Sequence, residues 1–144
     1  MRILGIDHGD QHIGIAISDP LGITAQPVAV LQKRANLQED MLELKAVMDK
    51  YEQKVTEIVI GLPKTLAGKV GFQALKVIEY VGALKTSFPE IKITTWDERF
   101  TSAAAEKNLI LMGMGRKDRK KVIDKSAATY ILQSYLDSKG HEKI

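Results

Sequence analysis

Three acidic residues occupy positions where an isolated carboxylate would be costly. Asp7 directly follows an apolar run, Glu98 follows a second strand-like segment, and Asp124 lies on an amphipathic segment near the end of the chain. A carboxylate in apolar surroundings loses its hydration and requires a cation or hydrogen-bond donors. Clustered carboxylates also raise one another's pKa unless a hard cation neutralises them. Oxygen ligands of this kind favour Mg²⁺ or Mn²⁺ over zinc, and two such ions can activate a water for attack on a phosphodiester.

Each acid also has an ordinary structural explanation. Asp7 could cap a tight turn by accepting backbone N–H groups. Glu98 lies between an aspartate and an arginine, which would suit a local ion pair, and Asp124 could pair with Lys120 or Lys121. The metal hypothesis therefore depends on a fold that brings all three acids together.

The segment around Asp124 has the spacing of a helix that packs against a sheet. Ala127, Ala128, Ile131 and Tyr135 follow Asp124 at offsets that place them on its own helical face. These side chains are small or apolar, so the face is expected to be buried. Asp124 is therefore predicted to point inward, where acids are rarely found unpaired.

A basic cluster overlaps the start of the same segment. Residues 116–125 contain six basic and two acidic residues, whereas the whole chain carries a net charge of only +3. Such a local excess suits a nucleic-acid backbone. A solvated helix start with no partner is the alternative. The residues predicted to bind the backbone beside the acids are Lys117, Arg119, Lys120, Lys121 and Lys125.

The elements that would position these residues follow from hydrophobic periodicity. Strands are predicted at residues 2–7, 13–18, 25–31, 57–62 and 91–96. Helices are predicted at about residues 37–51 and 72–88, from 101 or 102 to about 112, and at about 119–138. Short turns join the first three strands, which favours an antiparallel meander.

This order predicts an α/β protein with the RNase H-like fold. Its five-stranded mixed sheet would contain three antiparallel strands, then two parallel strands reached by crossovers, and helices would flank it. Right-handed crossovers would place the first, fourth and fifth strands parallel, with their carboxyl ends at one edge. Asp7 and Glu98 would both lie at that edge. A single domain is expected over residues 1–138, followed by a polar tail at 139–144.

The composition narrows the class of protein further. The chain has 144 residues, is 44% hydrophobic and contains no cysteine, which excludes disulfides and thiolate metal sites. No apolar run approaches the roughly 18 residues of a membrane helix, and no leader pattern precedes the first strand. A cytoplasmic protein without a membrane partner is expected. His8 and His12 flank the first turn and are expected to be surface residues outside the metal site.

Four segments carry a resemblance to a known family. They are RILGIDHGDQHIGIAISDPLGITAQP, IVIGLPKTLAG, WDERFTSAAAE and RKDRKKVIDKSAATYILQSYLD, and together they extend over nearly the whole chain. The sequence resembles the YqgF nuclease family, whose members are described as pre-16S rRNA nucleases and earlier as Holliday-junction resolvases. The resemblance implies an RNase H-like fold and metal-dependent cleavage of nucleic acid.

By the same resemblance, the family's acidic positions fall on Asp7 in GIDHG, Glu98 in WDER and Asp124 in IDKSAA. The implied role is processing of the 5′ end of pre-16S rRNA in the bacterial cytoplasm. Structured pre-rRNA and ribosomal assembly intermediates would then be the partners, with Mg²⁺ or Mn²⁺ as cofactor. Resolution of branched DNA is the alternative role.

The sequence departs from the family pattern in the loop after the fourth strand. Thr65 and Ala67 stand where amide or acidic residues are common, and Gln73 stands where an arginine is frequent. This loop keeps open a non-catalytic nucleic-acid-binding module on the same fold. A second rival is a kinase-like phosphate-binding protein, because residues 7–14 fit the turn D-x-G-x-x-x-x-G. Such proteins need two domains of this kind, which 144 residues would not supply.

Overall fold

The computed structural model describes residues 1–63, 71–98 and 111–142, apart from the side chains of residues 116, 118–126 and 140–142. Five strands and three long helices make up the described fold. The strands are β1 (Arg2–His8), β2 (His12–Ser18), β3 (Ala25–Gln32), β4 (Val55–Leu62) and β5 (Lys92–Asp97). The helices are α1 (Leu37–Met48), α2 (Phe72–Ser87) and α4 (Arg116–Glu142).

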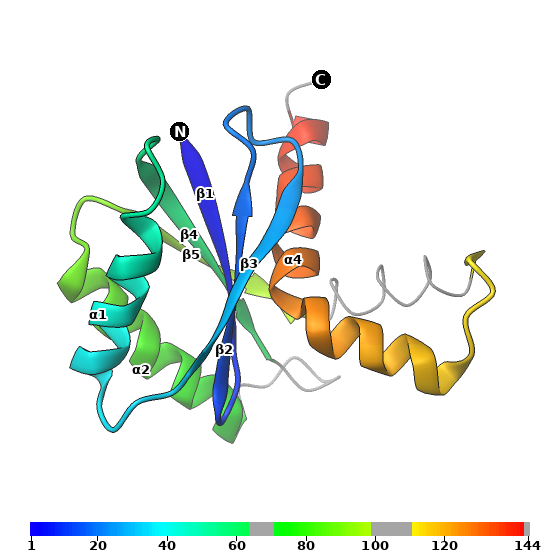
Figure 1. The fold of residues 1–144 in the computed structure, drawn as a ribbon, viewed down its shortest axis with the longest axis horizontal. Helices are drawn as coiled ribbons and strands as arrows, with labels where there is room; N and C mark the ends of the chain where they lie inside the picture. Colours follow the sequence, from blue (N-terminus) through cyan, green and yellow to red (C-terminus); the bar gives the residue numbers. More distant parts are fainter. Residues whose placement is uncertain (64–70, 99–110, 143–144) are drawn as a thin grey trace.

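The strands form one mixed sheet in the order β3-β2-β1-β4-β5 (Figure 1). β1 pairs antiparallel with β2, and β2 pairs antiparallel with β3. β4 is parallel to both β1 and β5. The predicted RNase H-like sheet is therefore confirmed, with the carboxyl ends of β1, β4 and β5 at one edge.

Helices cover both faces of the sheet (Figure 1). On one face, α1 and α2 pack over Leu4, Ile6 and the other apolar side chains of a large core. On the opposite face, α4 packs over Ala16 and Val59 to form a second, smaller core. Gly5 allows the close approach of α4, because a Cβ atom there would lie 2.7 Å from Leu132 Cβ.

Helix α4 confirms the predicted buried face but is longer than predicted. Ala128, Ile131 and Tyr135 are buried against the sheet, as their spacing indicated. The helix starts at Arg116 instead of 119 and continues to Glu142 instead of 138. The prediction missed these turns because they are polar and carry no apolar periodicity. The helix predicted between 101 or 102 and 112 falls mostly on residues 99–110, outside the described residues.

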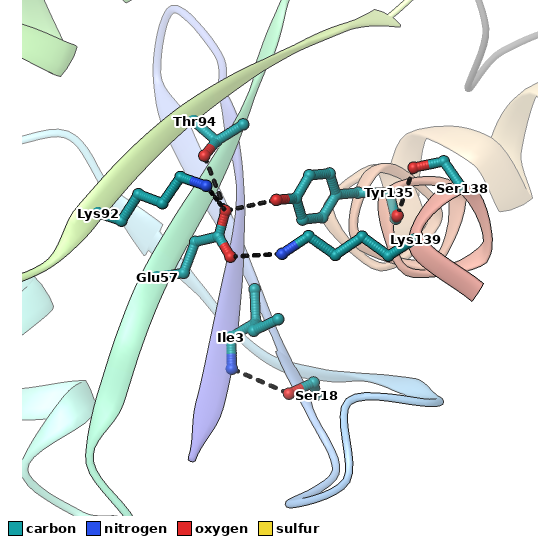
Figure 2. Close-up of polar contacts among 8 residues, drawn as sticks. All are labelled: Ile3, Ser18, Glu57, Lys92, Thr94, Tyr135, Ser138 and Lys139. Carbon is teal, nitrogen blue, oxygen red and sulfur yellow. Dashed lines mark hydrogen bonds and ion pairs between the residues drawn. The ribbon is translucent and has the colours of Figure 1, made fainter. Parts of the chain in front are cut away.

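A buried glutamate ties the second half of α4 to the sheet (Figure 2). Glu57 accepts hydrogen bonds from Thr94 Oγ1 at 2.8 Å, Tyr135 Oη at 2.5 Å and Lys139 Nζ at 3.1 Å. Glu57 lies near the start of β4, far along the strand from the carboxyl edge. It thus fixes α4 at the end remote from the acids. Within the described ranges, no helix is both long and apolar enough to cross a membrane.

Candidate active site

The carboxyl edge of the parallel strands brings two of the three predicted acids together. Asp7 is the penultimate residue of β1, and Glu98 directly follows β5. β4 lies between these strands, and the Glu98 carboxyl reaches over it to form a hydrogen bond with the carboxyl of Asp7. The strand ends that the sequence predicted to share an edge do so.

The surroundings of this pair alter its protonation. Burial, followed by the charge and hydrogen bond of Asp7 and the charge of Asp97, raises the pKa of Glu98 to about 7. The two carboxyls therefore share a proton near neutral pH when no cation is bound. A divalent ion would replace that proton, since hard carboxylate oxygens are the ligands that Mg²⁺ and Mn²⁺ prefer. The donor set fits a divalent metal.

Gly61 makes the pairing possible, a role that its sequence context did not indicate. A Cβ atom at Gly61 would lie 2.6 Å from Glu98 Oε1 and 2.6 Å from Ile131 Cδ1. Any side chain at this β4 position would therefore displace Glu98 or α4. A glycine that follows an apolar run is usually read as a turn signal, so only the position of Glu98 reveals its function.

For the third predicted acid and most of the basic cluster, the structure gives the position along helix α4 and no side-chain position. Asp124 lies one helical turn before Ala128 on this helix, but its side chain is outside the described part of the chain. The same holds for the side chains of Arg119, Lys120, Lys121 and Lys125, whereas Lys117 is described and exposed. Among the described residues, no group of three or more acidic or histidine side chains could hold a metal ion.

The two hairpin histidines differ in their environments. His12 is exposed, as predicted. His8 is half-buried, with its ring centroid 4.8 Å from that of the buried Tyr80. Burial lowers the pKa of His8, and the nearby Lys33 charge lowers it further. The prediction of a surface residue was wrong for His8, because α2 covers the end of β1 on this face.

Of the residues that depart from the family pattern, Gln73 contacts the turn between β1 and β2. Thr65 and Ala67 fall outside the described residues. Gln73 Nε2 donates a hydrogen bond to Asp10 Oδ2 at 3.1 Å, and Lys76 Nζ lies 3.0 Å from Asp10 Oδ1. Gln73 thus helps to hold the β1–β2 turn against α2.

Comparison with solved structures identifies the class of fold. The chain superposes on RuvC from Thermus thermophilus in complex with a Holliday junction substrate with a TM-score of 0.58. The match covers 96% of this chain and 95% of that chain at 16% sequence identity. A ROK family protein from Streptococcus pneumoniae gives a TM-score of 0.50, but only 38% of its length is covered. The chain therefore has the RNase H-like fold.

The sequence comparisons define its family. Residues 1–138 match the family described as "RuvX: Holliday junction resolvase", and the chain belongs to this family. It is 49% identical over 138 residues to a protein of Clostridium acetobutylicum named "Putative pre-16S rRNA nuclease", covering 96% of this chain and 99% of the relative. A relative of the same name from Clostridium tetani is 51% identical, with 96% and 97% covered. The resemblance to the YqgF nucleases is confirmed, and the chain is a nuclease that hydrolyses phosphodiester bonds.

Proposed function

We propose that Asp7, Glu98 and Asp124 hold the divalent metal with which this nuclease cleaves its substrate. When bound, Mg²⁺ or Mn²⁺ would activate a water and stabilise the charge that develops on the phosphodiester. The chain's own contribution is to orient the carboxylates and to exclude water from their buried side. Gly61 serves this purpose, because it leaves room for the Glu98 side chain above β4.

One observation carries the proposal. Two carboxyls from strands far apart in sequence form a hydrogen bond at the carboxyl edge, with the pKa of Glu98 raised to about 7. Burial and like charge destabilise the ionised form of Glu98, and a divalent cation would relieve both effects.

The proposed substrate is the precursor of 16S rRNA, cut at its 5′ end. Support comes from relatives about half identical to this chain that carry the name of pre-16S rRNA nuclease. The basic start of α4 would hold the RNA backbone through Lys117, Arg119, Lys120, Lys121 and Lys125. The nuclease would act in the cytoplasm, on structured pre-rRNA within ribosomal assembly intermediates.

A second candidate substrate is branched DNA. The description of the matching family, a Holliday junction resolvase, favours it. The same carboxylates and basic residues would serve either substrate, since both present a phosphodiester and an anionic backbone. The choice between RNA and DNA therefore rests with groups outside the metal site.

A cleavage assay tests the proposal directly. A 5′-extended 16S rRNA transcript and a four-way DNA junction would each be incubated with the protein and Mg²⁺ or Mn²⁺. We expect site-specific cleavage of the RNA and its loss in Asp7→Asn, Glu98→Gln and Asp124→Asn. Preferential cleavage of the junction would favour the second candidate. Wild type that cuts neither substrate better than Asp7→Asn would refute the catalytic assignment.

A further inference from the structure

A groove opens directly beside Asp7 on the face of the sheet that α4 covers. Its volume is about 360 Å³, within the roughly 300–1,000 Å³ typical of small-molecule sites. The wall residues come from the β2–β3 hairpin on one side and from α4 on the other. The most informative are Asp7, Gly14, Pro27, Val30, Ala128 and Thr129.

Strand register explains the shape of the groove. Asp7 pairs with Gly14, and Gly14 pairs with Val30, so the three positions form a row across the same face. Gly14 leaves the middle of this row empty and supplies the floor. A Cβ atom at Gly14 would lie 3.7 Å from Asp7 Cβ and 3.6 Å from Ala128 Cβ. These are ordinary contact distances, so an alanine would fit at this position.

Strand β3, at the edge of the sheet, contains a bulge beside the groove. Ile15 pairs with Ala29 whereas the next residue, Ala16, pairs with Pro27, so Val28 has no partner position on β2. Such a bulge bends the strand locally and is common beside active sites. In Figure 1, β3 curves across the sheet in front of β2. Val30 lies just beyond the bulge and is 63% exposed, which leaves a large apolar side chain uncovered in the groove that Asp7 also lines.

The described lining of the groove favours an apolar ring over a phosphate as occupant. None of the described residues that line the groove is a lysine or an arginine, and Asp7 closes one end with a carboxylate. Val30, Pro27 and Ala128 offer apolar surface for a flat ring. His12 and the Thr129 hydroxyl, which also line the groove, can hydrogen-bond to the edge of such a ring.

We infer that this groove receives the base of an unpaired nucleotide next to the phosphodiester that is cut. The inference rests on the proposed function, because Asp7 is shared by the groove and the metal site. A base within a duplex is stacked and paired, so it cannot enter a groove of this kind without leaving the helix. The nuclease would therefore select a locally unpaired nucleotide at its cleavage site.

Binding in EDTA tests the inference without requiring cleavage. Three RNA hairpins would be compared: one with a single bulged 2-aminopurine, one with an abasic residue at the bulge, and one fully paired. We expect the bulged base to improve affinity by roughly tenfold over both other probes, because the apolar wall of the groove would bury the faces of the base. We also expect a change in 2-aminopurine fluorescence when the protein binds.

Variants locate the effect in the groove. Val30→Glu places a charge on the apolar wall, and Gly14→Ala raises the floor; both should reduce the ratio of the affinity for the bulged probe to the affinity for the paired probe. Leu21→Glu is the matched control, since Leu21 is 80% exposed and lies beyond Ser18, at the end of β2 remote from Asp7. Far-UV circular dichroism would confirm that each variant is folded.

The outcomes separate this inference from the proposed function. Equal affinity for the bulged, abasic and paired hairpins would overturn the inference even if the protein cleaves RNA. An equal loss in Val30→Glu and Leu21→Glu would also overturn it. A preference for the bulged base that Val30→Glu abolishes would support the groove even if the catalytic assignment failed.

Discussion

The Glu98 side chain lies against Gly61 of β4 and fills the space that any side chain at position 61 would need. A Cβ atom at Gly61 would lie 2.6 Å from Glu98 Oε1 and 2.8 Å from Glu98 Cγ. The hydrogen bond between Glu98 and Asp7 therefore depends on a residue that carries no functional group. The Gly61→Ala substitution, which adds a single methyl group, tests this dependence.

The Gly61→Ala variant should lose most of its nuclease activity while it remains folded. The new methyl would displace Glu98 from Asp7, and misplacement of a catalytic group by about 1 Å can cost about 100-fold in rate. We expect a loss of stability of about 1–3 kcal/mol from overpacking against Glu98 and Ile131. Cleavage rates and urea unfolding would measure the two effects.

Gly82→Ala provides the matched control. Gly82 lies within α2, and a Cβ atom there meets nothing within 4 Å. This variant should keep full activity and gain up to about 1 kcal/mol of stability, because alanine favours the helix. Full activity in Gly61→Ala would show that the position of Glu98 does not matter for catalysis.

The stability of the metal-free protein should fall as the pH rises. Folding raises the pKa of Glu98 from 4.5 to about 7, so the folded chain binds this proton more tightly than the unfolded chain does. The stabilisation is fully present below pH 4.5 and is lost as the pH rises through about 7. In EDTA, the Tm should therefore decrease by a few degrees between about pH 5 and pH 8.

Two comparisons assign that pH dependence to the carboxyl pair. Glu98→Gln cannot titrate, so its Tm should change less over the same range. Mg²⁺ should raise the Tm of wild type more at pH 8 than at pH 5, because a metal ion and the shared proton compete for the same oxygens. Identical pH profiles for wild type and Glu98→Gln would contradict the raised pKa.

Hydrophobic periodicity and strand ends were enough to predict the sheet and its edge. The acids at the ends of β1 and β5 were placed correctly, because parallel strands leave their carboxyl ends together. The first turn of α4 at Arg116 was missed, since its polar residues carry no periodic signal. Gly61 and Glu57 could not be interpreted, because their partners come from β5 and α4, far away in the sequence.

Glu57 should matter for stability and little for chemistry. Its carboxylate is buried, which raises its pKa, but the hydrogen bonds from Tyr135, Thr94 and Lys139 outweigh burial and lower the pKa overall. Glu57→Gln would keep the size of the side chain and remove the charge that Lys139 faces. We expect a loss of about 1–3 kcal/mol in the free energy of unfolding at pH 7.

The contribution of Glu57 to stability should change with pH in the direction opposite to that of Glu98. Because folding lowers the pKa of Glu57, its stabilisation is present above the ordinary value of 4.5 and disappears as the pH falls through the lower folded value. The gap between Glu57→Gln and wild type should therefore close in acid. Lys92→Ala is the control, since the Lys92 side chain is 70% exposed and its ammonium lies 3.9 Å from the Glu57 carboxylate. Such a surface pair contributes at most about 1 kcal/mol, so an equal loss in both variants would refute the buried-anchor role.

Lys117 should contribute to nucleic-acid binding through charge alone. It is exposed in the first turn of α4 and lies within the basic cluster at residues 116–125. A lysine that neutralises one phosphate releases about one counterion, so Lys117→Ala should reduce the slope of log Kd against log salt by about one. The effect should be the same for all RNA sequences, because the backbone carries no sequence information. Lys85→Ala, at an exposed lysine in the last turn of α2, is the control and should leave the slope unchanged. Equal slopes for wild type and Lys117→Ala, measured by fluorescence anisotropy from 50 to 200 mM salt, would remove Lys117 from the interface.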